Sequence, residues 1–161
     1  MVQRAVESRI KTFLARYSPE VRVEFQAARA RLRALFPRGH ELVYDNYNAL
    51  VFAFAATERS PDAFVSVAGY PRWVTLFFLR GVDLVDPKRL LEGKGSQVRS
   101  IRLESARQMS ERAVHALLVQ AIKPHRKALL AAQPLTTTIK SVVARQRPRR
   151  PVAARPRNRS A

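Results

Sequence analysis

Aromatic and basic side chains gather near the ends of several expected strands, where they could bind a planar or anionic ligand. They are Tyr44, Tyr47, Tyr70, Arg72, Trp73 and Lys94. Aromatic rings beside an Arg guanidinium can stack a planar ligand, and the positive charge attracts an anion. The alternative interpretation is that these rings pack on the rim of the core. We predict a ligand-binding site lined by Tyr44, Tyr47, Arg72, Trp73 and Lys94.

Lys94 lies in the segment Gly93-Lys94-Gly95-Ser96, which resembles part of a phosphate-binding loop. A full phosphate-binding loop has the spacing Gly-x-x-x-x-Gly-Lys-Ser/Thr and leads into a helix, and this segment has neither property. Two interpretations follow. One is a small anion site built from backbone N–H groups and Lys94, and the other is a helix stop followed by a turn.

The charge of the chain is strongly positive and concentrates toward the C-terminus. The formal net charge is +18, and residues 123–161 contain eleven Lys or Arg and no Asp or Glu. Each phosphate that such a segment contacts releases counterions, which favours polyanion binding. We predict nucleic-acid contacts from five arginines of this segment: Arg145, Arg147, Arg149, Arg150 and Arg155. A solubilising or partner-docking extension is the alternative.

A second set of arginines is spaced along an expected helix near the N-terminus. Arg22, Arg29 and Arg33 share much of one face of this helix. Such a face is typical of a solvated helix, and a nucleic-acid footprint is the alternative because the C-terminal charge has the same sign. No helix-turn-helix, zinc-finger or RNA-recognition signature accompanies these arginines.

The sequence lacks the usual patterns of catalytic and metal-binding residues. There is no Cys, which excludes disulfides, thiolate nucleophiles and Cys-ligated zinc. His40, His115 and His125 have neither the spacing of a helical metal clip nor a suitably spaced carboxylate. Glu41 and Asp45 lie about 13 Å apart along one strand, too far for a shared metal, and we interpret them as solvated strand-edge charges. We therefore predict no catalytic residue, no metal and no cofactor.

Length and composition indicate one globular domain with an appendage. The chain has 161 residues, of which 47% are hydrophobic, and this is enough for a single core. Its longest apolar run, residues 49–56, is far shorter than the roughly 20 residues that span a bilayer. The first residues contain no apolar segment of signal-peptide length. We expect a cytoplasmic protein that does not enter membranes.

The spacing of apolar residues changes along the chain from a helical period to a strand period and back. Helical spacing predicts two N-terminal helices, over residues 3–17 and 18–36, the second beginning at Ser18-Pro19-Glu20. Alternating or wholly apolar runs predict strands over residues 41–45, 50–56, 64–68, 73–79 and 98–103. A short helix is expected over residues 86–91, and a last helix from Ser110 to Ala132 is expected to kink at Pro124.

These elements predict an α+β fold of two layers. A mainly antiparallel sheet of four to five strands is covered by N- and C-terminal helices. After Ala132 the apolar spacing ends, and the chain is rich in Pro, Arg, Ser, Thr and Ala. We therefore predict a folded domain over residues 1–132 and a disordered basic tail over residues 133–161.

Three segments resemble, in order, the YdhG-like family, also called domain of unknown function 1801. They are residues 41–50, 70–78 and 93–103. The first two resemble the family's paired strands, and the third resembles its Lys-Gly segment leading into a basic and apolar strand. The likeness covers about residues 17–130 and implies a small bacterial, cytoplasmic α+β domain. Some relatives are linked to iron delivery in a frataxin-like role, but this chain has no acidic ridge and its positive charge repels Fe²⁺.

The residues favour a non-enzymatic module that binds a small anionic ligand at the sheet rim and a polyanion, such as nucleic acid, through the tail. Two alternatives stay open. One is the frataxin-like iron chaperone that the resemblance suggests. The other is an enzyme without a recognised motif, for which Asp45 or Glu41 would be the catalytic carboxylate.

Overall fold

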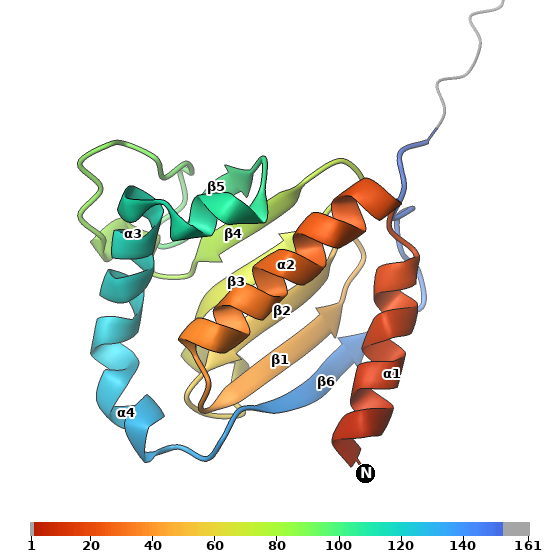
Figure 1. Ribbon diagram of the computed structural model, residues 1–161, viewed down its shortest axis with the longest axis horizontal. Helices are drawn as coiled ribbons and strands as arrows, with labels where there is room; N and C mark the ends of the chain where they lie inside the picture. The colour runs from red at the N-terminus through yellow and green to blue at the C-terminus, as the bar shows by residue number, and fades with distance from the viewer. Residues whose placement is uncertain (1, 153–161) are drawn as a thin grey trace, which may run out of the picture.

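The chain folds around one mixed sheet, which the computed structural model describes for residues 2–152 (Figure 1). The sheet has six strands in the order β5-β4-β3-β2-β1-β6. They are β1 (His40–Asp45), β2 (Leu50–Ala55), β3 (Ala63–Gly69), β4 (Val74–Phe78), β5 (Arg99–Leu103) and β6 (Thr136–Val142). Neighbouring strands are antiparallel except β1 and β6, which are parallel. The predicted α+β class and mainly antiparallel sheet are confirmed, and the sheet is one strand larger than the upper expectation.

The α-helices in residues 2–152 are α1 (Val2–Ala15), α2 (Pro19–Leu35), α3 (Arg112–Ile122) and α4 (Arg126–Ala131). Figure 1 shows α2 crossing one face of the sheet, α1 beside β6, and α3 and α4 on the other side of α2. Pro124 lies in a 3-10 turn (Lys123–His125) that separates α3 from α4, so the expected kink is confirmed. None of the helices in this range is long and apolar enough to cross a membrane.

Most expected elements agree with the structure to within a few residues, but the short helix over residues 86–91 is wrong. Instead, the Asp86 carboxylate accepts hydrogen bonds from the N–H groups of Leu90 (3.0 Å) and Leu91 (2.8 Å). A side chain that bonds its own following backbone closes a turn and competes with helix formation. The pattern that suggested a capped helix is therefore a capped turn.

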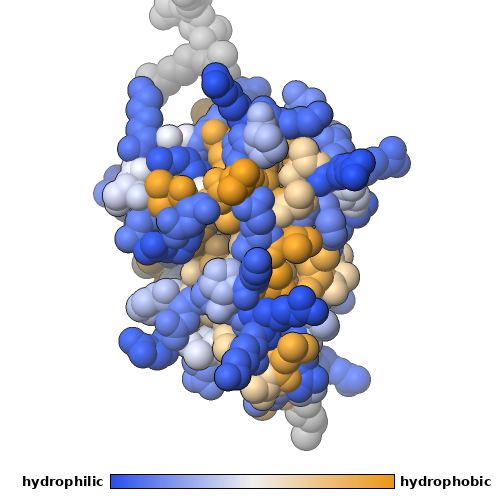
Figure 2. All heavy atoms as spheres, turned by 90° about the vertical axis from the view of Figure 1, so that its left-hand side faces the viewer, coloured by the Kyte–Doolittle hydropathy of each residue, from blue (hydrophilic) through white to orange (hydrophobic). Residues whose placement is uncertain are grey.

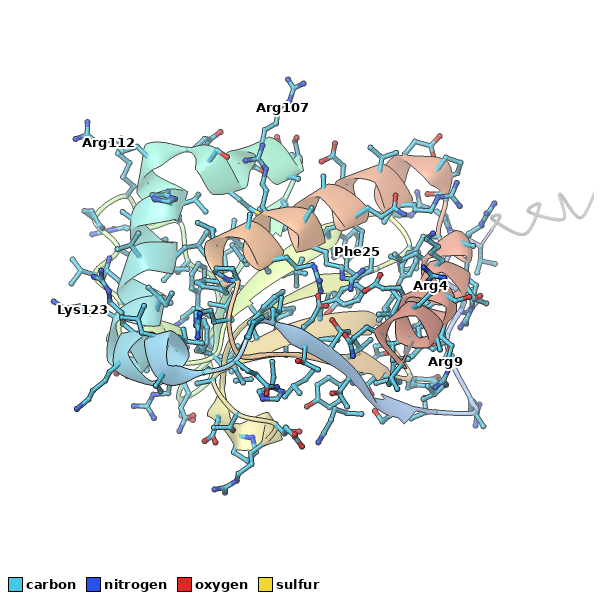
Figure 3. The ribbon with its side chains drawn as sticks, turned by 60° about the horizontal axis from the view of Figure 1, so that its bottom comes forward. Arg4, Arg9, Phe25, Arg107, Arg112 and Lys123 are labelled. Carbon is cyan, nitrogen blue, oxygen red and sulfur yellow. The ribbon has the colours of Figure 1, made fainter. Side chains whose placement is uncertain are left out.

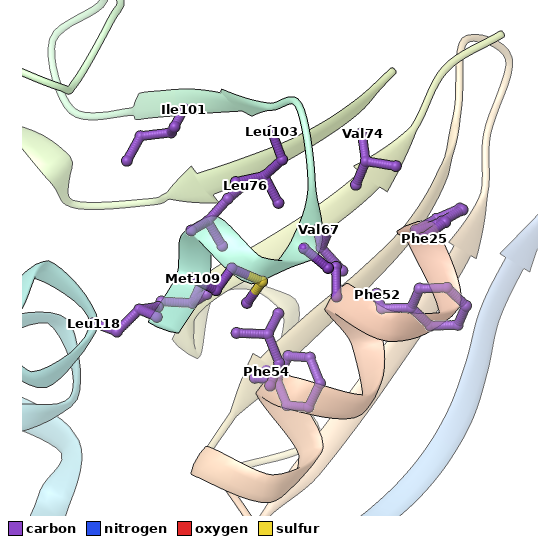
Figure 4. Packing of buried hydrophobic residues seen from close by; sticks show 14 of the residues in the cluster. Phe25, Phe52, Phe54, Val67, Val74, Leu76, Ile101, Leu103, Met109 and Leu118 are labelled. Carbon is purple, nitrogen blue, oxygen red and sulfur yellow. The ribbon is translucent and has the colours of Figure 1, made fainter. Parts of the chain in front are cut away.

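The core lies between α2 and the sheet, where aromatic residues from both layers meet. Pro19 opens α2 at a position where its missing N–H leaves no hydrogen bond unmade. Phe25 of α2 packs edge-on against Phe52 of β2, with ring centroids 5.3 Å apart. Figure 4 shows Val67 of β3 and Leu76 of β4 continuing this cluster toward β5. The alternation along β2 thus places its phenylalanines on the helical side.

A buried tyrosine fixes the linker between α1 and α2 to the sheet. The Tyr17 hydroxyl donates to the carbonyl of Gly69 (2.7 Å) and accepts from the N–H of Leu50 (3.1 Å). Burial raises the pKa of Tyr17 to about 12. Gly69 is required here because a Cβ at this position would lie 2.3 Å from the Phe25 ring. The start of β2 and the end of β3 are therefore tied to the same helical layer.

The prediction of a disordered tail is wrong for the residues that the structure describes after Ala132. Thr136–Val142 forms the edge strand β6, which pairs with β1 along its whole length, with a register shift between Val43 and Tyr44. The chain then returns toward the loop after β1, where Arg149 is buried. The folded unit thus extends past the expected boundary at residue 132, and residues 153–161 lie outside the described range.

The reason for this difference is the balance between charge and strand propensity. The segment of β6 reads Thr-Thr-Thr-Ile-Lys-Ser-Val and contains a single basic residue, while β-branched side chains favour strands. The arginines that suggested disorder follow the strand and do not interrupt it. A parallel edge strand also has no adjacent partner in the sequence, so local patterns could not reveal it.

The structure predicts that residues 133–152 contribute strongly to the stability of the fold. A chain ending at Ala132 loses β6 and leaves Asp45 buried without Arg149, so its melting temperature should fall by at least about 10 °C. A chain ending at Val152 should have the same melting temperature as the full-length protein. Thermal melts followed by far-UV circular dichroism measure both values, and equal melting of the Ala132 chain and the full-length protein would contradict the role of β6.

Candidate anion-binding cleft

A cleft lies where two turns of the sheet meet the C-terminal segment, which we define as residues 143–152. One turn follows β1 and contributes Asn48, and the other joins β3 to β4 and runs from Tyr70 to Trp73. The Tyr70 N–H donates to the Trp73 carbonyl (2.8 Å), which closes the second turn. Both turns lie at the same end of the strands because β1, β2, β3 and β4 pair antiparallel in succession.

The buried guanidinium of Arg149 holds the C-terminal segment against the end of β1. Arg149 is 3% exposed and donates to Asp45 Oδ1 at 2.9 Å. It also donates to the backbone carbonyls of Asn46 and Tyr47. The Arg147 N–H donates to the same Tyr47 carbonyl (2.8 Å). A charge-assisted hydrogen bond with additional carbonyl acceptors satisfies most of the donors of a guanidinium, which makes its burial tolerable.

A second arginine ties the segment to the helical layer. Arg150 Nε donates to the carbonyl of Arg16 (3.2 Å), and an Arg150 terminal nitrogen donates to the carbonyl of Ala15 (3.3 Å). These carbonyls lie at the C-terminal end of α1, where the helix leaves acceptors free and favours positive charge. The segment is therefore anchored on two sides.

The anchored segment and the two turns enclose a cavity of about 610 Å³. Three arginines, Arg72, Arg147 and Arg150, line it, and its lining includes no Asp, Glu or His. Within residues 2–152, none of these three guanidinium groups forms an ion pair with a carboxylate. The cavity therefore presents uncompensated positive charge, which is suited to an anion.

Aromatic rings form the apolar part of the cleft. The rings of Tyr70 and Trp73 lie 5.9 Å apart between centroids, with an angle of 32° between their planes. The Arg102 guanidinium lies 3.8 Å from the centroid of Trp73, and that of Arg147 lies 5.4 Å from the centroid of Tyr47. Burial raises the pKa of the Tyr70 hydroxyl above its ordinary value.

The structure brings together part of the predicted ligand site. Arg72 and Trp73 line the cavity, and Tyr47 adjoins it through its contact with Arg147. Tyr44 lies elsewhere, on the far face of β1, with its hydroxyl bonded to Ser60.

Lys94 also lies away from the cleft. Its loop leads into the end of β5 at which Arg99 pairs with Phe78, whereas Trp73 precedes Val74 at the other end of β4. The geometry thus does not include Tyr44 or Lys94 in one site with Trp73.

The predicted nucleic-acid arginines separate into distinct environments. Arg147 and Arg150 line the cavity, and Arg145 is exposed. Arg149 is buried against Asp45 and cannot face a polyanion, so the expectation for this residue is corrected. Arg155 lies outside the described residues.

Sequence reasoning did not place Asn48, Pro148 or the backbone of the C-terminal segment in the site. The sequence offered one signal for the position of this segment, which is Arg149 beside Pro148. In the structure, Arg149 pairs with the buried Asp45 at the end of β1. A burial pattern alone could not show this pair, because the two residues are separated by 104 positions.

The interpretation of Glu41 and Asp45 as solvated charges is wrong, since both side chains are buried. Glu41 Oε2 accepts from Arg29 Nε (2.9 Å), and Glu41 Oε1 accepts from Arg29 (2.8 Å), from Arg33 and from the Thr137 hydroxyl (2.8 Å). Arg29 also bonds Glu7 of α1 at 2.6 Å. The network joins α1, α2, β1 and β6, so Arg29 belongs to the interior and not to a solvated face.

Burial and hydrogen-bond partners shift the pKa values of several ionisable groups. Burial lowers the pKa of Arg29, but its hydrogen bonds to Glu41 and Glu7 outweigh this effect and raise its pKa above the ordinary value. The hydrogen bond from Arg29 lowers the pKa of Glu7 despite partial burial. Elsewhere, burial lowers the pKa of His125, whose ring stacks on Phe64 at 4.8 Å. In residues 2–152, no three His, Asp or Glu side chains gather as metal ligands would.

Comparisons with protein-family models, with curated proteins and with solved structures found no match to this chain. The resemblance to the YdhG-like family therefore stays a prediction from the three segments that suggested it.

The Glu41 network predicts a strong effect of one substitution on stability. Glu41→Gln leaves Arg29 and Arg33 with less compensation in a buried site, which should lower the free energy of unfolding by about 3–5 kcal/mol. Asp83→Asn is the matched control because Asp83 pairs with Arg80 at an exposed position, and its loss should cost no more than about 1 kcal/mol. Urea denaturation measures both, and similar small effects would disprove the structural role of Glu41.

The lowered pKa of Glu7 predicts an acid dependence of stability. A carboxylate whose folded pKa lies below its unfolded value stabilises the protein above the unfolded pKa, and this contribution is lost as pH falls. The free energy of unfolding should therefore fall below about pH 4.5, the ordinary value for Glu. Glu7→Gln should reduce that fall. An unchanged pH profile in this variant would show that the Arg29–Glu7 bond is not formed in solution.

Proposed function

We propose that this protein is a non-enzymatic module that binds a phosphate-bearing ligand in the cleft, and that this ligand is single-stranded nucleic acid. The observation that carries the proposal is the lining of the cavity, in which three arginines and two aromatic rings occur without an acidic residue. Guanidinium groups bind phosphate oxygens through paired N–H donors, and aromatic rings contact bases. The combination suits a nucleotide unit better than a simple anion.

The three arginines differ in how free they are to bind. Arg150 already donates to two helix carbonyls, so much of its hydrogen-bonding capacity is used within the protein. Arg147 lies against the Tyr47 ring, and Arg72 lies on the turn before β4. Neither of these two has a carboxylate partner in residues 2–152. We assign phosphate binding mainly to Arg72 and Arg147.

The aromatic residues supply contact for a base or sugar. Arg102 lies over one face of Trp73, so a base would meet the opposite face or the ring edge beside Tyr70. Aromatic contact of this kind tolerates different bases because every base has a π face. The proposed binding is therefore of low sequence specificity.

The size of the cavity favours a single strand over a duplex. A volume of about 610 Å³ falls in the range of small-molecule sites and admits a nucleotide unit, not a base-paired helix. The sequence after the C-terminal segment adds Arg155, Arg157 and Arg159, whose positions lie outside the described residues. Because these arginines directly follow the cleft residues in the sequence, their charge favours contact with more than one phosphate.

The alternatives have less support from the described residues. Asp45 and Glu41, the carboxylates considered for an enzyme, are both paired with buried arginines and do not line the cavity. The frataxin-like iron chaperone stays a prediction from the family resemblance. A cytoplasmic location is part of the proposal, because a nucleic-acid ligand is found there.

The proposal predicts that ligand binding quenches the fluorescence of Trp73. Trp73 is the sole tryptophan of the chain and lines the cavity, so its emission reports on this site alone. Titration with an oligodeoxythymidine of about eight nucleotides should give saturable quenching, with affinity falling as salt rises. Arg72→Ala and Arg147→Ala should each weaken binding by about tenfold, the loss of one charge-assisted contact.

Two controls separate this mechanism from general attraction to a positive chain. Arg107→Ala removes an exposed charge on the 3-10 turn Ala106–Ser110, where the side chain points away from the body of the protein (Figure 3). This variant should leave the titration nearly unchanged. Inorganic polyphosphate should bind without the same quenching, because it has no base to contact the ring. Equal effects of all three Arg variants, or no quenching by the oligonucleotide, would refute the cleft as the binding site.

A further inference from the structure

A second concave surface lies at the opposite end of β1 from the cleft. We call it the apolar groove: it is a cavity of about 570 Å³ between the end of α2, α3 and α4. Its floor contains Leu35, Phe36, Ile122 and Leu129. β1 begins at His40 beside this groove and ends at Asp45 beside the cleft, so the two sites are separated by the length of a strand.

Apolar surface continues from the floor of the groove onto its exposed margins. Val119 of α3 is 52% exposed and Leu130 of α4 is 66% exposed, and both line the groove. Figure 2 shows apolar patches on this side of the molecule, with hydrophilic side chains between and around them. A ligand confined to the floor would leave these margins in water, whereas a broader partner would cover them.

The polar side chains of the groove are all basic. Arg38, Lys123 and Arg126 line it, and no acidic residue does. None of the three pairs with a carboxylate in residues 2–152. The groove thus combines an apolar floor with a positive margin, and an occupant needs the complementary pattern of an apolar face flanked by acidic groups.

These features distinguish between possible occupants. A second copy of this chain would bring the same three cations toward its partner at a symmetric interface, within a chain of net charge +18. A fatty acid could fill the floor but would contact neither Val119 nor Leu130 fully, since small ligands are usually enclosed by their sites. An amphipathic helix covers both floor and margins with residues at i, i+3, i+4 and i+7.

We propose that the apolar groove docks an acidic amphipathic helix of a partner protein. Leu or Ile side chains on one face of that helix occupy the floor beside Phe36 and Leu129. Glu or Asp side chains on its flanks pair with Arg38, Lys123 and Arg126. The apolar floor supplies affinity, and the basic margin selects acidic helices and sets their orientation.

The test uses the full chain and two labelled synthetic peptides of about 15 residues. The first peptide contains Leu at helical spacing with Glu on the flanks, and the second has the same composition with Leu at alternate positions. Both carry the same charge, so attraction to the basic chain is equal for the two. Fluorescence anisotropy at 0.15 M salt, where long-range attraction is screened, should show at least about tenfold tighter binding of the first peptide.

Variants locate the binding to the groove. The double variant Val119→Asp and Leu130→Asp changes two exposed positions, so the fold should persist, as a thermal melt will verify. It should weaken binding of the helical peptide by about tenfold or more. The double variant Val23→Asp and Val85→Asp is the matched control because it adds the same two negative charges at positions that are 61% and 70% exposed and do not line the groove.

The other occupants give different results, and each would overturn the proposal. Equal binding of the two peptides would show attraction by charge alone, and an unaffected double variant would place binding elsewhere. If sodium decanoate binds with the same dependence on the double variant and the helical peptide does not bind, the groove is an acyl-chain site. If the protein sediments as a dimer that the double variant dissociates, its occupant is a second copy.

Discussion

The buried ion pair between Asp45 and Arg149 is the interaction on which the organisation of this protein depends. It joins the end of an inner strand to a segment far along the chain, at a site where the Asp45 and Arg149 side chains are only 2% and 1% exposed. Removing one partner of such a pair leaves a charge in a poorly solvated site, which costs far more than the pair contributes. The pair therefore contributes little net stability. Its main effect is to fix the position of the C-terminal segment, because any other position would leave Asp45 buried without its partner. In this position the segment completes the cleft, next to the edge strand β6.

The distribution of charge follows a simple division between interior and surface. Two strand acids, Glu41 and Asp45, lie inside, and each is compensated by arginines from other elements. Because each buried acid is paired with an arginine, these pairs do not reduce the excess of positive charge in a chain with 30 Lys and Arg against 12 Asp and Glu. The cleft and the apolar groove both have basic linings without acids, in keeping with this excess. The basic linings support an anionic partner at each site. The partner proposed for the cleft has bases and phosphates, and the partner proposed for the apolar groove is a helix with apolar and acidic side chains.

The sequence was sufficient to predict most of the local elements and the fold class. Phe52 and Phe54 in an apolar run predicted an inner strand, and Ser18-Pro19 predicted the start of α2, because both signals are local. The position of Arg72 and Trp73 at a sheet edge followed from the turn between two strands. What could not be predicted depends on pairing between distant residues. β6 finds its partner β1 about 96 positions away, and Arg149 finds Asp45 at a separation of 104 positions. Lys94 was placed with Trp73 because both lie at strand ends, but the register of β4 and β5 puts them at opposite ends.

The most direct test of this account is an NMR titration of the ¹⁵N-labelled full chain with the thymidine oligonucleotide. The single indole N–H of Trp73 and the backbone amides of Arg147, Arg149, Arg150 and Val152 should shift together and saturate at the same ligand concentration, since one cleft holds both. Shifts confined to residues 153–161, with the Trp73 indole unmoved, would contradict it and would reduce the protein's attraction for nucleic acid to the charge of its last residues.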